Sequence, residues 1–436
     1  MLYNFAMTAS LGQEMHALAA RLFPINRSLT GPGVRETLSI LQEHLQDLQI
    51  YEVKSGTSAF DWEIPNEWSV NDAYVKDETG KKIIDFKTSN LHLMGYSTPV
   101  NYLVTREELM KHLHTLPDQP TAIPYVTSYY SEDWGFCVAD EDLQNIGDGP
   151  FEVYVDSTLG PGVMNYADLI IQGQTDEEIL LSTYFCHPSM ANNELSGPVV
   201  LTFIAKWLKE IPLKDRKYTY RLVMVPETIG SIYYISKNLE SLRKVRAGWV
   251  LTCIGDERTY SYVPSRDGNT LADRVSKKVL SEIYPDYKTY SWLDRGSDER
   301  QYCSPGVDLP VASIMRSKYG EYPEYHTSLD DLSLVTPDGL YGGFVAMQAA
   351  IKMLEANAVF KTRVPCEPQL GKRGLYPNTS VKSSGHLVRD QMNVLSYCDG
   401  VNDLISIAEL CKIEFTVALE IINRLTAADV IERLDL

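Results

Sequence analysis

Hydrophobic positions at the start of the chain repeat with the spacing of a helix. Apolar residues recur every three to four positions over residues 10–23 and again over 34–45, with a Gly-Pro-Gly break between the two runs. This spacing predicts two amphipathic helices. The run IYEVKSG at 50–56 follows them and predicts a strand.

The pattern changes between residues 56 and 159. Short runs rich in Tyr, Val, Trp and Thr alternate with turn signals such as Asn71-Asp72 and the Glu-Thr-Gly at 78–80. Such a texture is typical of antiparallel strands. We therefore predict an inserted β domain over 56–159, with one helix at 105–116.

Apolar strands alternate with helical patterns from residue 160 to residue 360. The predicted strands lie at 163–173, 177–185, 219–226, 248–255 and 309–315, and the predicted helices at 197–211, 269–283 and 339–357. Apolar strands separated by helices indicate a sheet covered on both faces, an α/β/α arrangement. With the N-terminal helices packed on this sheet, the α/β domain is discontinuous and comprises 1–55 and 160–360.

The C-terminal end forms a third predicted domain. A linker rich in Pro, Gly, Lys and Ser covers 364–385, and three short helical patterns and a final apolar run, VIERLDL, follow it. Three short helices and a strand predict a winged helix-turn-helix over 365–436.

The charge balance argues against a nucleic-acid partner. With 58 acidic and 40 basic side chains, the formal net charge is -18. The predicted recognition helix, EFTVALEIINRLTAAD, carries a single Arg, whereas helices that read the major groove present several basic and amide side chains. We expect no nucleic acid and interpret the winged helix as a protein-contact or oligomerisation module, which leaves a homo-oligomer open.

The termini and cysteines predict a cytoplasmic protein. The N-terminal residues lack the basic start and apolar core of a signal peptide, and no segment reaches the ~18 apolar residues of a membrane span. The seven cysteines show no C-x-x-C pairing. We expect no membrane association and a reducing compartment.

Polar residues with metal-binding or acid–base chemistry follow the predicted strands. His187, Glu227 and Asp256 each come directly after a strand, and Asp298 and His326 flank a later one. Reactive groups of open α/β sheets gather beyond the carboxyl ends of the strands. Imidazoles and carboxylates in such places are the inventory of a zinc site with a carboxylate base.

Each of these residues also has an ordinary structural interpretation. A histidine after a strand more often makes a hydrogen bond than binds a metal, Glu227 and Asp256 can cap helices, and His326 can belong to a turn. Their joint occurrence at successive strand ends favours the metal site.

Three motifs resemble those of a known superfamily. The loop ANNELSG at 191–197, PETIGS at 226–231 and Tyr-His-Thr at 325–327 are similar to motifs of the zinc aminopeptidase superfamily. That superfamily includes aminopeptidase S, glutamate carboxypeptidase and glutaminyl cyclase. The resemblance implies a three-layer α/β/α zinc-exopeptidase-like fold. The whole chain resembles an uncharacterised bacterial aminopeptidase-like family with a β insertion and a winged helix, whose members are often linked to surface-polysaccharide biosynthesis loci.

The resemblance also implies roles for individual residues. It makes Glu227 the general base, and it makes Asp298 either a supporting carboxylate or a contact for a substrate amine. The implied metal positions are His187 and Asp256 for one ion, His326 for a second ion, and Asn193 where the superfamily has a bridging Asp.

Two departures from the superfamily pattern change the expected metal content. Asn193 is neutral and bridges two cations poorly, and Thr228 replaces a second Glu. Two zinc ions need anionic ligands to offset their repulsion, so we expect one zinc ion rather than two. Two alternatives stay open: Glu194 replaces the lost carboxylate if the loop is rearranged, or a one-residue shift of the alignment makes Glu227 a ligand.

These observations support a zinc-dependent hydrolase of the aminopeptidase type that acts on a small peptide or peptide-like amide. A second interpretation is a pseudoenzyme that serves as a binding or scaffold protein, favoured by Asn193 and Thr228. A third is a regulator that uses the winged helix, which the acidic recognition helix argues against.

Overall fold

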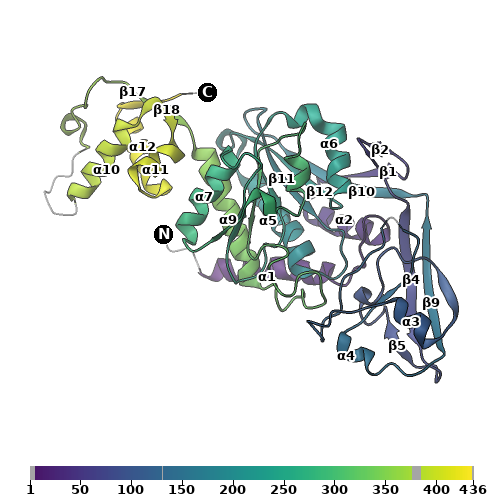
Figure 1. Cartoon of the computed structure of the whole chain (residues 1–436). Coiled ribbons are helices and arrows are strands. Elements are labelled where there is room, and N and C mark those ends of the chain that lie inside the picture. Colours follow the sequence, from purple (N-terminus) through teal and green to yellow (C-terminus); the bar gives the residue numbers. More distant parts are fainter. Residues whose placement is uncertain (1–4, 130, 376–383, 435–436) are drawn as a thin grey trace. The chain divides into compact units, whose positions relative to one another are not determined.

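The computed structural model in Figure 1 describes residues 5–129, 131–375 and 384–434. Contacts divide the chain into two compact units, Met1–Asp273 with Asp286–Met347, and Arg274–Pro285 with Gln348–Leu436. Part of the linker predicted at 364–385, residues 376–383, lies outside the described residues.

The first unit contains a sheet of eight strands in the order β1-β10-β12-β11-β13-β16-β14-β15. Strands β12, β11, β13 and β16 are parallel to one another, and the strands toward both edges include antiparallel pairs. The strands are β1 (Gln49–Lys54), β10 (Val163–Ile171), β11 (Glu178–Tyr184), β12 (Thr219–Val225), β13 (Val245–Leu251), β14 (Ser261–Val263), β15 (Lys288–Thr289) and β16 (Val311–Met315).

Both faces of the central strands are covered. Every residue of β11, β12 and β16 is buried, which explains their mainly apolar sequences. Helix α5 packs against β11, β12 and β13, α2 packs against β10, and α8 packs against β16 and α6. Outside the segment between β1 and β10, the helices of this unit include α1 (Phe5–Leu22), α2 (Pro32–His44), α5 (Ser196–Glu210), α6 (Ile229–Leu242) and α8 (Glu299–Tyr302), with short turns η3 (Leu213–Asp215) and η4 (Trp292–Asp294).

A second sheet lies in the segment between β1 and β10. Its antiparallel order is β5-β4-β9-β6, formed by β4 (Glu67–Lys76), β5 (Lys82–Asp85), β6 (Val100–Val104) and β9 (Phe151–Gly160). Two smaller pairs are β2 (Ser58–Ala59) with β3 (Trp62–Glu63) and β7 (Leu113–His114) with β8 (Phe136–Cys137). The remaining elements are η1 (Asn90–His92), α3 (Arg106–Lys111) and α4 (Asp140–Leu143).

The second unit has its own sheet and helices. Strand β17 lies between β18 and β19 and pairs antiparallel with both. The elements are β17 (Val359–Thr362), η5 (Gly371–Arg373), α10 (Ser384–Ser396), β18 (Asp399–Asp403), α11 (Leu404–Cys411), α12 (Phe415–Ala427) and β19 (Ile431–Leu434). Helices α7 (Leu271–Ile283) and α9 (Pro337–Ala356) each begin in the first unit and end in the second.

The predicted fold class, mixed α/β with a large central sheet and a C-terminal winged helix, is confirmed. Local boundaries differ where pairing outweighs the sequence pattern. The helix predicted at 105–116 ends at Lys111, because Leu113 and His114 pair with β8. The strand predicted at 248–255 is shifted toward the N-terminus, because Cys253 has a positive φ of 48° and turns the chain out of the sheet.

Over the described residues, no helix is both long enough and apolar enough to span a membrane.

Candidate metal centre and active site

The predicted site residues follow neighbouring parallel strands. His187 follows β11, Glu227 follows β12 and Asp256 follows β13. Because these strands are adjacent and parallel, their carboxyl ends lie at one edge of the sheet. The sheet topology therefore gathers the three residues in the same region.

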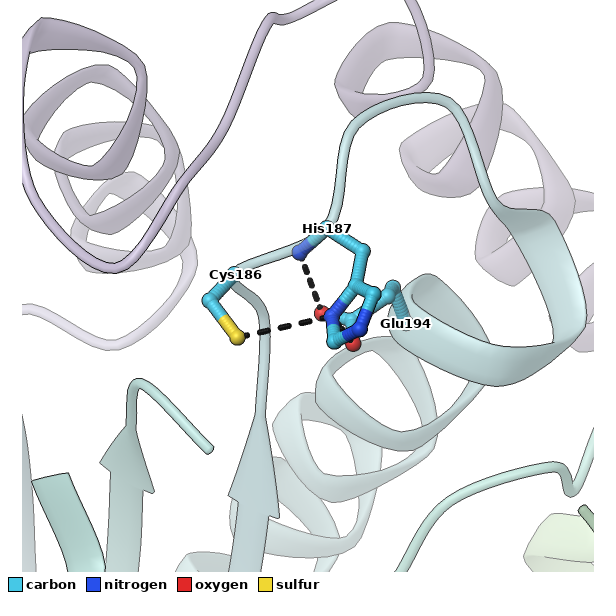
Figure 2. A group of neighbouring side chains, drawn as sticks. All are labelled: Cys186, His187 and Glu194. Atoms are coloured by element: carbon cyan, nitrogen blue, oxygen red, sulfur yellow. Dashed lines mark hydrogen bonds and ion pairs between the residues drawn. The ribbon is translucent and has the colours of Figure 1, made fainter. Parts of the chain in front are cut away.

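A π-helical turn, η2 (Ala191–Leu195), directs Glu194 back toward His187. The backbone N–H of His187 donates a hydrogen bond of 2.9 Å to Oε2 of Glu194, and Nδ1 of the His187 ring contacts Oε1. Figure 2 shows both side chains beside Cys186, whose Sγ lies 3.4 Å from Nδ1 of His187. Such wide turns are rare and frequently occur at functional sites.

These three side chains fit a zinc ion. Ligand atoms of Cys186, His187 and Glu194 all lie within 4.8 Å of one another, and all three residues are buried. Oε1 of Glu194 is buried, and the ring nitrogen Nδ1 of His187 contacts it. Sulfur, imidazole nitrogen and carboxylate oxygen are the ligands of zinc in proteins, and three protein ligands leave a position for substrate.

Burial sets the proton affinity of the thiol in this group. It raises the pKa of Cys186 well above the ordinary value, and the carboxylates of Glu194 and Glu227 add to the effect. A cation in the site would favour the opposite, ionised form of the thiol. Metal binding at Cys186 would therefore be coupled to release of a proton.

Arg27 contacts the backbone that carries His187. Its guanidinium is buried, with Nε donating to the backbone carbonyl of His187 at 3.1 Å and Nη1 donating to that of Leu22 at 2.7 Å. Burial lowers the pKa of Arg27 to about 10, and the charge of Glu194 opposes this shift. Arg27 thus ties the loop after α1 to the backbone of His187 and places a positive charge near Glu194.

A strained turn positions Glu227. Thr228 has φ 65° and ψ -76°, and the backbone N–H of Ile229 donates to the carbonyl of Glu227 at 2.8 Å, which closes a γ-turn. Asp298 holds this turn, because its Oδ1 accepts hydrogen bonds from Thr228 N and Ser231 Oγ, both at 2.8 Å. Asp298 therefore contacts the backbone that carries Glu227.

Burial raises the pKa values of Glu227 and Asp298. Burial, followed by the charges of Asp298 and Glu194, raises the pKa of Glu227 well above its ordinary value. Burial raises the pKa of Asp298 to about 7, although Thr228 and Ser231 donate hydrogen bonds to it. A carboxylate with a raised pKa is a better proton acceptor near neutral pH, which is the property that a general base needs.

Asn193 and His326 interact directly with each other. Nε2 of His326 lies 3.1 Å from Oδ1 of Asn193, and the amide nitrogen of Asn193 donates to the hydroxyl of Tyr184 at 3.1 Å. The rings of His326 and His187 lie 5.1 Å apart, centre to centre. Burial, together with His187, lowers the pKa of His326 to about 3, so this imidazole is neutral near pH 7.

Asp256 lies in a separate hydrogen-bond network. Its carboxylate is fully buried and accepts hydrogen bonds from Asn192 Nδ2, Arg258 N, Ser317 N and Ser317 Oγ at 2.8–3.1 Å. It is not a member of the ligand group formed by Cys186, His187 and Glu194. The predicted role of Asp256 as a metal ligand stays a prediction, and the observed contacts are those of a side chain that joins three loops.

A small cavity opens beside the metal-ligand group. Its volume is about 200 Å³, and of the sequence-predicted site residues it is lined by His187 and Glu227. The remaining lining residues are Leu29, Trp62, Tyr129, Cys186, Thr228 and Ile229. Asn193, Asp256, Asp298 and His326 do not line this cavity, although Asp298 and His326 are connected to it through neighbouring residues.

The sequence pattern does not point to Cys186 as a candidate ligand or to Arg27 as a contact of His187. Cys186 lies at the end of an apolar strand, where buried thiols are common. The feature of the sequence that could indicate a metal-binding role for Cys186 is its position directly before His187. Glu194 is an alternative from the sequence, and η2 brings its carboxylate to His187. Its role as a metal ligand stays a prediction.

Comparison with known proteins places the chain among described families. The family described as "Domain of unknown function (DUF4910)" matches residues 16–357, and a winged helix-turn-helix family matches residues 358–433. A Clostridium acetobutylicum protein named as a candidate polysaccharide biosynthesis protein with an aminopeptidase-like domain is 44% identical over 410 residues, which cover 94% of this chain and 93% of that protein.

Solved structures with a similar fold include peptidases. The crystal structure of a candidate peptidase from C. acetobutylicum has a TM-score of 0.92 at 41% identity, covering 98% of this chain and 97% of that one. A zinc aminopeptidase from Bacillus subtilis has a TM-score of 0.57 at 11% identity, covering 79% of this chain and 95% of that one. The second comparison shows the aminopeptidase-like fold alone.

Proposed function

The chain belongs to the family described as Domain of unknown function (DUF4910), and on that premise we propose that it is a zinc-dependent hydrolase of peptide or peptide-like amide bonds. The observation that carries the proposal is the group of Cys186, His187 and Glu194 at a cavity that Glu227 also lines. A zinc ion would supply Lewis acidity there, polarising a carbonyl and activating water.

The chain's own residues would handle the proton. Glu227 lines the cavity and has a raised pKa, so its carboxylate accepts a proton from water and returns it to the leaving amine. Asp298 keeps Glu227 in position through Thr228 and Ser231. Arg27 keeps His187 in position through its backbone carbonyl.

One zinc ion is the proposed content. Asn193 provides a neutral amide where two metals would need a shared carboxylate, and its Oδ1 already lies at hydrogen-bond distance from His326. This hydrogen bond occupies Nε2 of His326, which reduces its capacity to hold a second ion. The proposed site is therefore mononuclear, and Asn193 and His326 are paired with each other outside the lining of the cavity.

The name of a relative supports a proposal about the biological role of this chain. The relative that is 44% identical is named for polysaccharide biosynthesis, so we propose a role for this chain in making a surface polysaccharide. We propose a small peptide or amide as substrate and a cytoplasmic location, with neither nucleic acid nor membrane as a partner.

A second candidate function is a binding protein without turnover. The neutral residues Asn193 and Thr228 favour it, because both stand where hydrolases of this fold class would carry an acidic group. Such a protein would bind a small molecule in the cavity without breaking a bond in it.

Turnover of a panel of amides separates the two candidates. Aminoacyl anilides and N-acetylated amino sugars would be incubated with protein treated with chelator and with the same protein after one equivalent of zinc. The hydrolase predicts zinc-dependent release from at least one compound class. Binding of these compounds without any release, at full zinc content, would favour the binding protein.

A further inference from the structure

An apolar groove lies next to the candidate active site. Its volume is about 340 Å³, and its walls come from a short hairpin, from helix α6 and from the loop that follows α8. The apolar side chains among its lining residues include Phe60, Trp62, Ile232, Ile235, Leu239 and Val307. Asp61 is the single charged residue in the lining.

Helix α6 connects this groove to the cavity that holds Glu227. Ile229, at the start of α6, lines the cavity, whereas Ile232, Ile235 and Leu239 line the groove. These positions are three to four residues apart, so they lie along one face of the helix. The groove therefore continues the cavity along α6.

Trp62 provides a second connection. Its side chain lines both the cavity and the groove. It belongs to the hairpin of β2 and β3, in which Phe60 is 60% exposed and has a positive φ of 53°. Exposed aromatic side chains that border an apolar groove are typical of ligand-binding surfaces.

We propose that this groove binds an unbranched alkyl or acyl chain of the substrate. The inference rests on the proposed function, because the amide of that substrate would lie in the cavity beside His187 and Glu227. Ile232, Ile235 and Leu239 would form the floor under the chain, and Phe60 and Trp62 would cover it. The substrate class is then an amphiphile with a small polar head and a linear apolar tail.

A second groove, which Trp62 also lines, is a different candidate for the substrate tail. It has a volume of about 620 Å³ and is lined by Trp62, Tyr129 and the acidic residues Asp61, Glu63 and Glu132. Carboxylates with aromatic rings favour a cationic group rather than an alkyl chain. Both grooves border the cavity, since the acidic groove shares Trp62 and Tyr129 with it and the apolar groove shares Trp62. We favour the apolar groove for the substrate tail because Asp61 is the one charged residue in its lining.

Binding of 1-alkanols tests the proposal on the full chain treated with chelator. Titration calorimetry would measure affinity for alkanols from butanol to dodecanol. We expect affinity to rise about fourfold per added methylene, which is the effect of burying a CH₂ group, and then to reach a plateau when the groove is full. Phe60→Ser should weaken dodecanol binding about fivefold, and Ser304→Trp, which fills the groove, should abolish the dependence on chain length.

Two controls test whether the effects of the variants arise from the groove itself. Leu103→Ser removes a side chain that is 68% exposed on β6, outside the groove, and should leave the series unchanged. Thermal unfolding of each variant would establish that the fold persists. Affinity that does not change with chain length in the wild type would overturn the proposal. Unchanged dodecanol affinity in Phe60→Ser, or an unchanged dependence on chain length in Ser304→Trp, would overturn it as well.

Further outcomes separate this inference from the proposed function. Alkylammonium ions that bind more tightly than alkanols, with an advantage lost in Glu63→Gln, would assign the tail to the acidic groove and overturn the proposal. Alkanol binding needs neither zinc nor turnover, so it would support the groove even if no amide is hydrolysed. Hydrolysis whose rate does not depend on the length of the substrate's alkyl chain would support the proposed function. It would also show that the groove does not bind the substrate.

Discussion

Several residues around the site adopt a backbone conformation that L-residues rarely take. Ser189, Thr228, Cys253 and His326 all have positive φ, between 40° and 65°. Each such residue costs about 1–3 kcal/mol and persists only where surrounding contacts fix it. Strained backbone of this kind clusters at functional sites, so its occurrence in four segments of one region supports the proposal for this region.

Replacing Glu227 should separate metal binding from turnover. Glu227→Gln keeps the size of the side chain but removes its capacity to accept a proton, so amide hydrolysis should fall by about 10²–10⁴-fold. Zinc content should stay unchanged, because Glu227 is not in the ligand group. Kinetics and elemental analysis of one preparation would measure both. Glu240→Gln, on the exposed part of α6, is the matched control.

Asp298 should make the stability of the zinc-free protein depend on pH. Its folded pKa is about 7 against an ordinary 3.8, so between these values the folded state holds a proton that the unfolded state releases. Its contribution to the free energy of unfolding therefore decreases as pH rises through this window. Asp298→Asn removes that contribution.

Melting temperatures of the variant and the wild type, measured from pH 4 to pH 8, would test this reasoning. The difference should shift in favour of Asp298→Asn as pH rises, whereas exposed Asp118→Asn should track the wild type. A difference independent of pH would show that Asp298 is ionised in the folded protein.

Strand-end positions predict some of the side chains at the cavity and miss others. His187 and Glu227 were predicted from their positions after strands, and both line the cavity. The ligand group itself depends on the direction in which η2 turns Glu194, and no periodicity in the sequence encodes a π-helical turn. The hydrogen bonds of Asp256 come from segments far apart in the chain, so a strand-end position alone could not reveal them.

At the scale of elements, close packing of α5 against the sheet fixes the loop that holds Glu194. A Cβ added to Gly197 would lie 2.1 Å from the carbonyl oxygen of Leu251 and 2.4 Å from Oγ1 of Thr183. Neither the backbone carbonyl nor the hydrogen-bonded Thr183 can move freely, since Thr183 donates to that same carbonyl. The first turn of α5 therefore requires glycine.

Gly197→Ala should destabilise the protein by about 1–3 kcal/mol through this overpacking. It should also lower zinc affinity, because η2 precedes this turn directly. Chemical denaturation and zinc titration would measure the two effects. Gly160→Ala is the control, since a Cβ there meets no atom within 4 Å, and it should leave both quantities unchanged.

The second unit contains a partly buried ion pair at the start of α11. Asp403 accepts hydrogen bonds from Arg274 Nη1 and Nη2 at 2.8 and 2.5 Å, and its side chain caps α11 by accepting from Ser406 N. Burial alone would raise the pKa of Asp403, but Arg274, Asn357 and Ser406 together lower it to about 2. Its stabilising effect is therefore present above pH 4 and lost as pH falls toward 2.

Asp403→Asn should destabilise this unit by about 1–3 kcal/mol at neutral pH. Asn caps a helix as well as Asp does, so the loss would report on the unpaired Arg274. Hydrogen exchange in α11 would measure it. Asp429→Asn, which breaks an exposed ion pair with Arg363, should change exchange by less than about 0.5 kcal/mol. Equal effects of the two variants would contradict the assigned contribution of burial.

Elements with strong periodicity were predicted well, and short ones were not. Buried strands such as β11 and β12 are mainly apolar, so the pattern predicts their positions. The two-residue pairs β2–β3 and β7–β8 depend on contacts across loops, which carry no sequence period. The hairpin that bears Phe60 and Trp62 is one of these, and for this reason the apolar groove was absent from the sequence-based expectations.

At the scale of the whole molecule, the chain combines an aminopeptidase-like α/β unit with a winged-helix unit. The expectation that the winged helix does not read DNA stays a prediction. It depends on a net charge of -18 and on α12, where Arg424 is the single basic residue. We therefore propose that the first unit carries the chemistry of the molecule.

Zinc content is the most direct test of that assignment. Protein purified without chelator or metal-affinity resin would be analysed for zinc per chain, together with His187→Ala and Glu194→Gln. We expect about one equivalent in the wild type and its loss in both variants, because both side chains belong to the candidate ligand group. Absence of zinc after incubation with the metal, or full zinc content in both variants, would contradict the account.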